Sequence, residues 1–243
     1  MKNKIAITAI IIVVFIFGIS LGLYLTPEKI VEVEKPNLFT GNVVKEMAIV
    51  GVNEKGEGVK GTLIVEMKEG TGLVLVNIND VLADYNTQLS ARNAAKVASN
   101  ITQVNLANKD LIYNIKANAS LIEGTSAGSV MAVATVASLE NKNIKEEVFM
   151  TGAIDENGNI LPVAGIKEKS EAAKRAGADL FLIPKGDYIN GYGEEISCAR
   201  LRDYEYCEIS YTPEFIDVSS MFGLDVKEVS NVREAAELIL DEK

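Results

Sequence analysis

The sequence predicts an α+β domain in which helices pack on a mixed β-sheet. Three observations indicate this class: short apolar runs typical of strands, glycine-rich turns that join such runs into hairpins, and alanine-rich segments with helical spacing between them. About 200 residues remain after an apolar N-terminal segment, enough for one hydrophobic core and short for two ordinary domains. We therefore expect a single domain over residues 43–243.

The secondary-structure elements can be assigned in chain order. Ala91, Ala94 and Ala98 recur at helical spacing, and Asn231 stands where it can cap the last helix. The pattern predicts a hairpin over 47–67, a strand over 72–80, a helix starting near Ser90, a strand over 109–119, a helix from Ser126 to about Leu139, a hairpin over 148–165 with its turn at "DENG", a helix from Gly165 to Ala176, a buried strand over 179–184, and a closing strand and helix over 224–240.

The N-terminus predicts a membrane anchor. An uncharged run over residues 5–25 follows Lys2 and Lys4 and is long enough to cross a hydrocarbon core as a helix. We expect residues 1–25 to form a cytoplasmic tip and transmembrane helix, residues 26–42 a linker, and the folded domain to lie outside the cell membrane. A cleaved secretory signal peptide is the alternative, although its apolar region is usually shorter and ends in small residues.

Composition excludes some functions and leaves one question open. The net charge of -10 argues against a nucleic-acid binder, which needs a basic face. The chain has no histidine and no paired-cysteine motif, so neither a metal nor another cofactor is predicted. Cys198 and Cys207 can form a disulfide in an outward-facing domain, or they can be two unpaired buried thiols.

The segment "EGTSAGSV" places Ser126 in a Gly-x-Ser-x-Gly pattern that often marks a nucleophile. The nucleophile elbow of α/β-hydrolases requires a later histidine, so a chain without histidine excludes it. A serine at a helix N-terminus remains, where backbone N–H groups can stabilise an oxyanion. The alternative is a helix start in which Thr125 or Ser126 is only a cap.

A lysine is the strongest candidate for the missing base. In "GIKEKSEAAKRAG", Lys169 shares one helix face with Ile166, Ala173 and Ala176, whereas the other basic residues lie on the opposite face. Burial lowers the pKa of a lysine, and a neutral amine can accept a proton. The alternative is a lysine whose stem follows the core edge while its amine reaches water.

Residues 121–186 resemble the Lon-type serine protease domain. They carry, in family order, the serine motif, the "MTG" strand, the "GNILP" hairpin and the "GIKEK" helix. The resemblance implies Ser126 as nucleophile and Lys169 as general base. It also implies that Thr151 orients the lysine and that Glu123 is an acidic neighbour of the site, although an ordinary strand threonine and a solvated loop carboxylate are the alternatives for these two.

The chain also departs from the family pattern. Thr125 precedes the serine, Ala153 replaces the usual glutamate after Thr-Gly, and Ala164–Gly165 replaces Gly-Gly. Residues 187–218 exceed the usual connection and receive no role.

No Gly-x-x-x-x-Gly-Lys-(Ser/Thr) phosphate loop is present, so we expect peptide hydrolysis without ATP. The expected partners are protein or peptide substrates and the membrane, and the resemblance leaves a homo-oligomer open. A non-catalytic interaction module at the membrane is the alternative function.

Overall fold

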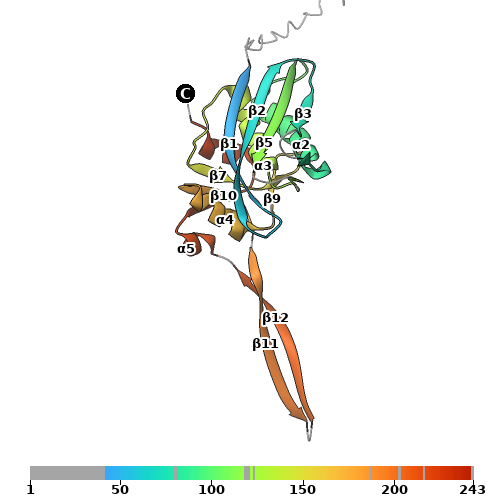
Figure 1. Cartoon of the computed structure of the whole chain (residues 1–243), viewed down its shortest axis with the longest axis vertical. Helices are drawn as coiled ribbons and strands as arrows, with labels where there is room; N and C mark the ends of the chain where they lie inside the picture. Colours follow the sequence, from blue (N-terminus) through green and yellow to red (C-terminus); the bar gives the residue numbers. More distant parts are fainter. Residues whose placement is uncertain are drawn as a thin grey trace, which may run out of the picture. The chain divides into compact units, whose positions relative to one another are not determined.

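The computed structural model describes residues 42–78, 82–117, 121–122, 124–186, 188–201, 204–215 and 217–241. In the described part of the chain, helices and strands are interspersed along the sequence (Figure 1). The strands form one four-stranded sheet, one three-stranded sheet and three two-stranded pairs. The predicted α+β class is confirmed.

The four-stranded sheet forms one side of the main hydrophobic core. Its order is β1 (Val43–Val52), β2 (Gly58–Glu69), β5 (Lys109–Ala117) and β3 (Val74–Asn77). The β1–β2 and β2–β5 pairs are antiparallel, whereas β3 and β5 are parallel, so the sheet is mixed as predicted. Alternate residues of β2, namely Leu63, Val65 and Met67, are buried on the core side.

Two helices cover that side of the sheet: α2 (Tyr85–Thr102) and α3 (Gly128–Glu140). The alanines that predicted α2 are buried, but the prediction that it starts near Ser90 is wrong by one and a half turns. It starts at Tyr85 because the Asp84 side chain caps it. Helix α3 is buried on nearly every side, which explains its predominance of small and apolar residues.

The predicted start of α3 at Ser126 is also wrong, since the helix begins at Gly128. Ser126 and Ala127 lie in the turn that precedes it, with the Gly128 N–H donating to the Thr125 carbonyl oxygen at 2.9 Å. The serine therefore lies just outside the helix.

A second, parallel sheet has the order β13 (Asp225–Val229), β10 (Leu180–Pro184) and β7 (Val148–Met150). The predicted 148–165 hairpin is smaller than expected: β8 (Ala153–Ile154) pairs with β9 (Ile160–Leu161) around the "DENG" turn, and β7 joins β10 instead. Helix α4 (Ile166–Arg175) precedes β10 in the chain, α5 (Val218–Phe222) precedes β13, and α6 (Val232–Ile239) follows β13. Asn231 caps α6, as predicted.

Residues 189–215, between β10 and α5 in the chain, contain a long two-stranded ribbon. Strands β11 (Ile189–Leu201) and β12 (Tyr204–Phe215) pair with each other and with no other described strand (Figure 1). Cys198 and Cys207 face each other in this pairing and form a disulfide, which settles the open question about the two thiols. A further short pair joins β4 (Leu82–Ala83) to β6 (Leu121–Ile122).

The predicted membrane segment, residues 5–25, lies outside the described residues. Among the helices that the structure does describe, none combines the length and the apolar character needed to cross a membrane.

Candidate active site

Ser126 lies in the short loop between β6 and α3, of which the structure describes residues 124–127. The serine is half-buried. The N–H groups of Gly128 and Ser129 are already occupied, since they donate to the carbonyl oxygens of Thr125 and Gly152. Within the described residues, the N–H groups of Ser126 and Ala127 have no protein acceptor. These two N–H groups, rather than those of Gly128 and Ser129, can therefore donate hydrogen bonds to a negatively charged oxygen beside the serine.

The end of β7 holds one side of the serine loop. The carbonyl oxygen of Ser126 accepts the N–H of Gly152 at 3.0 Å and the Thr151 hydroxyl at 3.3 Å. In return, the Ser129 N–H donates to the Gly152 carbonyl oxygen at 3.0 Å. A Cβ atom on Gly152 would lie 2.6 Å from Ile160, so this close approach requires glycine. The "MTG" segment therefore fixes the backbone of the serine.

Asp84 holds the other side of the loop. Its carboxylate accepts the Thr87 N–H at 2.7 Å as the cap of α2, and it also accepts the Gly124 N–H at 3.2 Å. The Thr87 hydroxyl is within hydrogen-bond distance of both the Asp84 carboxylate and the Gly124 carbonyl oxygen. Burial by itself would raise the pKa of Asp84, but the hydrogen bonds from Thr87, Gly124 and Asn86 together lower it. Asp84 thus stays ionised while it anchors the loop.

The sequence interpretation missed Asp84, although a local signal was available. Because the helix start was placed near Ser90, the aspartate at 84 was not considered as a cap. The pattern Asp-x-x-Thr before a helical segment is typical of an N-cap.

Lys169 is buried, as its helical phase predicted, with 4% of the residue exposed. The alternative of an amine that reaches water does not hold. The Nζ atom donates to the Ala164 carbonyl oxygen at 2.9 Å. Burial lowers the pKa of Lys169 from its ordinary value of 10.5 to about 8, against a smaller opposing effect of the Glu168 charge. A minor fraction of this amine, about 10% at pH 7 and about 25% at pH 7.5, is therefore neutral.

The structure brings together only some of the predicted site residues by direct contact. Thr151 contacts the backbone of Ser126, and its hydroxyl bonds to that carbonyl oxygen rather than to the lysine. In the described part of the chain, no hydrogen bond joins Lys169 to Ser126 or to Thr151. Glu123 lies outside the described residues.

The three family departures have clear places in the structure. Thr125 is exposed in the serine loop, and Ala153 is buried in β8. Gly165 is the N-cap of α4 and has a left-handed φ of 71°, which favours glycine. No group of three or more Asp, Glu or Cys side chains within the described ranges is arranged to hold a metal ion.

A mixed sheet, a buried helix behind the serine loop and a buried lysine on α4 define an α+β domain of the Lon-protease class. The family model of the Lon protease (S16) C-terminal proteolytic domain matches residues 42–192, and the chain belongs to this family. The predicted class, a serine endopeptidase domain of the Lon type, is confirmed at the family level.

Curated Lon proteases share this part of the sequence. The archaeal Lon protease of Methanocaldococcus jannaschii is 27% identical over 154 residues, covering 61% of this chain and 24% of that protein. The Lon protease of Clostridium acetobutylicum is 44% identical over 78 residues, covering 32% of this chain and 10% of the relative. The Lon protease of Vibrio parahaemolyticus is 35% identical over 111 residues, covering 46% of this chain and 14% of that protein. The chain thus matches no more than about a quarter of the length of these relatives.

Proposed function

We propose that this chain is a membrane-anchored serine endopeptidase that hydrolyses peptide bonds in unfolded or flexible protein segments without ATP. Ser126 is the nucleophile and Lys169 the general base. The observation that carries the proposal is the environment of Lys169: its amine is buried, has the neutral Ala164 carbonyl as its hydrogen-bond partner among the described residues, and has a pKa of about 8. A lysine in this state can serve where the chain has no histidine.

The proposed reaction starts with neutral Lys169. Its bond to Ala164 uses one N–H donor and leaves the nitrogen lone pair available. Substrate binding turns this lone pair toward Ser126, and the amine accepts the hydroxyl proton as the Oγ atom attacks the peptide carbonyl carbon. The N–H groups of Ser126 and Ala127 stabilise the oxyanion that results.

The protonated lysine then completes the cycle. It gives its proton to the leaving amine, which releases the first product and leaves an acyl ester on Ser126. A water molecule that Lys169 deprotonates hydrolyses this ester and restores both residues. We assign Thr151 to hold the Ser126 backbone, on the basis of its bond to that carbonyl oxygen. Glu123 is proposed as an acidic neighbour that favours the protonated lysine during the reaction.

Two features of the sequence and one of the structure support the cellular setting that we propose. Residues 5–25 have the length and apolar character of a membrane helix, and Lys2 and Lys4 favour a cytoplasmic N-terminus. The disulfide of the ribbon fits an oxidising compartment outside the membrane. ATP independence is proposed because the 243 residues contain no phosphate-binding loop. A homo-oligomer is compatible with this setting.

One observation favours the second candidate, a non-catalytic interaction module. The Lys169 amine donates to Ala164, and no hydrogen bond among the described residues joins it to Ser126. Catalytic hydrogen bonds are often long or poorly aligned without substrate and tighten when it binds, so a peptidase in its free state is compatible with this geometry.

Cleavage of casein and of unstructured peptides by the full chain in detergent tests the proposal. We expect turnover without nucleotide, and loss of at least about 1,000-fold on Ser126→Ala or Lys169→Ala. Ser138→Ala, in the helix that follows the serine loop, and Lys174→Ala, in the helix that carries Lys169, are matched controls, and we expect both to cleave as the parent does. A serine-directed phosphonate should label Ser126 in the parent. Equal cleavage by all four variants would exclude the dyad.

A further inference from the structure

The first residue of β2 lies directly against the backbone of α4. A Cβ atom added to Gly58 would lie 1.8 Å from the Glu168 carbonyl oxygen and 3.1 Å from the Cβ atom of Ala172. Real atoms do not approach so closely, so the strand and the helix must move apart if Gly58 gains a side chain. The φ angle of Gly58 is outside the left-handed region, and the position therefore requires glycine for this contact and not for its backbone conformation.

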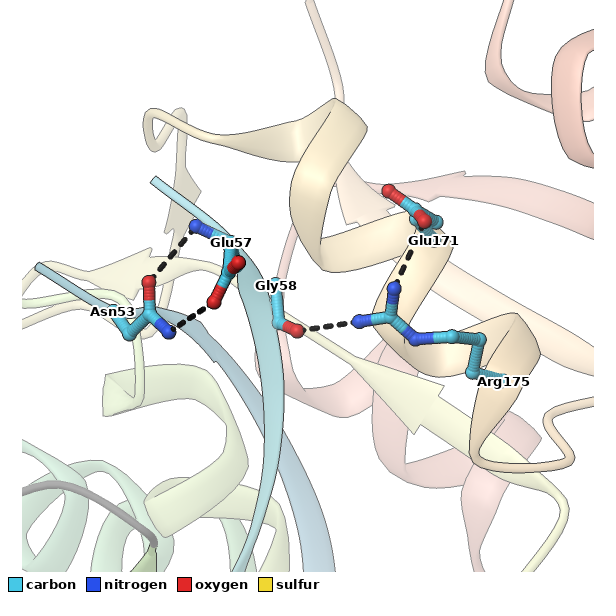
Figure 2. Close-up of polar contacts among 5 residues, drawn as sticks. All are labelled: Asn53, Glu57, Gly58, Glu171 and Arg175. Carbon is cyan, nitrogen blue, oxygen red and sulfur yellow. Dashed lines mark hydrogen bonds and ion pairs between the residues drawn. The ribbon is translucent and has the colours of Figure 1, made fainter. Parts of the chain in front are cut away.

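Arg175, in the last turn of α4, bonds to the same glycine. Its Nη2 atom donates to the Gly58 carbonyl oxygen at 2.6 Å, and its Nη1 atom donates to the Glu171 carboxylate at 2.8 Å (Figure 2). The Arg175–Glu171 ion pair is exposed and contributes little stability by itself. It does orient the guanidinium toward the strand. A direct contact and a hydrogen bond thus join Gly58 to two successive turns of α4.

The strand before the turn contacts the opposite end of the helix. A Cβ atom on Gly165, the N-cap of α4, would lie 2.7 Å from a methyl carbon of Val52. The turn between these strands is closed by Asn53, whose side-chain oxygen accepts the Glu57 N–H and whose amide donates to the Glu57 carboxylate (Figure 2). The same oxygen also accepts the N–H of Lys55. Both flanks of one closed turn therefore lie against α4.

We propose that Gly58 and Arg175 are positioning residues that set where α4 presents Lys169, and this inference rests on the proposed role of that lysine as base. Glu168, whose carbonyl oxygen lies against Gly58, immediately precedes Lys169 in the helix. The loop that carries Ser126 is held by other elements, α2 and the end of β7. A displacement of α4 therefore moves the base relative to the nucleophile, and errors of about 1 Å in such placements can lower turnover by about 100-fold.

The test compares Gly58→Ala with Gly51→Ala in the full chain. Gly51 lies in β1 beside the same turn, its φ is outside the left-handed region, and a Cβ atom there would meet only a Val59 methyl carbon, at 4.0 Å. We expect Gly58→Ala to lower kcat for a peptide substrate by about tenfold or more with KM within about twofold, because substrate-binding groups are untouched. Gly51→Ala should keep the kcat of the parent. Arg175→Ala should cause a smaller loss of kcat, and Arg175→Lys, which keeps a donor for Gly58, should restore most of it.

A second measurement separates failure of this inference from failure of the proposed function. The rate at which acetic anhydride modifies the Lys169 amine, followed by mass spectrometry below the melting temperature, reports the placement of the lysine without any turnover. We expect this rate to rise at least about threefold in Gly58→Ala and to stay unchanged in Gly51→Ala, because a buried amine is modified only when its surroundings open. If the parent has no peptidase activity but the modification rate rises in Gly58→Ala, the proposed function is wrong and the positioning role stands. If kcat and the modification rate both match the parent in Gly58→Ala and Arg175→Ala, the positioning role is wrong.

Discussion

The Nζ atom of Lys169 donates to the carbonyl oxygen of Ala164 across 2.9 Å, just before the helix that carries the lysine begins. None of the ion pairs among the described residues includes this amine. A carbonyl group offers a lone pair but no full charge, so it accepts a bond from the neutral amine as well as from the ammonium ion. Since none of these ion pairs stabilises the charged amine, burial lowers the pKa of Lys169.

The first prediction concerns the pH dependence of turnover. The proposed base works only when it is deprotonated, so kcat/KM should be low at pH 6, rise with an apparent pKa of about 8, and level off above pH 9. Glu168 opposes the lowering of the Lys169 pKa, so Glu168→Gln should move the rise to lower pH. Initial rates of peptide cleavage between pH 6 and 10 measure both effects, with Glu237→Gln as a distant control. A rate independent of pH over this range would contradict a lysine base.

The second prediction is that the proposed base destabilises the fold. Between pH 8 and 10.5 the unfolded chain holds a proton on Lys169 that the folded chain has lost, so stability rises with pH across this window. Below pH 8 the full penalty is present, and it amounts to about 3 kcal/mol.

Lys169→Met keeps the length of the side chain and removes its charge. We expect the variant to be inactive but more stable than the parent by up to about 3 kcal/mol at pH 7, with the difference vanishing as the pH approaches 10.5. Urea unfolding at several pH values measures the gain. Lys174→Met, on the exposed face of the same helix, should change stability by less than about 0.5 kcal/mol. A Lys169→Met variant that is less stable than the parent at pH 7 would show that the amine is not destabilising where it lies.

The sequence identified Lys169 because burial of one helix face is a periodic, local signal. The contacts that position the proposed site have no such signal. Arg175 is 117 residues from Gly58, and Asp84 is 40 residues from Gly124. In the sequence, Gly58 looks like an ordinary turn residue. Only the folded structure shows that it permits the close approach of α4.

Strand pairing and the ribbon show the same limit. The turn at "DENG" was predictable because a hairpin is local, whereas the parallel pairing of β7 with β10 joins segments about 30 residues apart. The ribbon was left without a role, and those of its residues whose burial the structure describes are exposed, so no buried face imposes an apolar alternation on them. Its facing residues Ile196 and Ile209 are 61% and 50% exposed.

The third prediction concerns Asp84, which both caps α2 and holds Gly124. Asp84→Ala should lower the free energy of unfolding by about 1 kcal/mol through loss of the cap and should also lower kcat, because the serine loop loses one of its two anchors. Asn231→Ala is the matched control: it removes the cap of α6, so it should cost a similar amount of stability and leave kcat unchanged. Chemical unfolding and peptide turnover on both variants check this. Equal losses of kcat in the two variants would reduce Asp84 to a structural cap.

The fourth prediction concerns the disulfide. A lone two-stranded ribbon is marginally stable in water, and a bridge between Cys198 and Cys207 closes a loop of nine residue steps, worth about 2 to 3 kcal/mol in the chain-entropy account. Replacing both cysteines by serine should therefore make residues 189–215 a site of rapid limited proteolysis, and adding a reductant to the parent should have the same effect. The strands of the ribbon pair with no other described strand, so the melting temperature of the remaining domain should stay within about 1 °C of the parent. Mass spectrometry of the cleavage products, together with thermal melting of the clipped chain, distinguishes these regions. A fall in the melting temperature of the whole domain would mean that the ribbon contributes to the fold of the protease body.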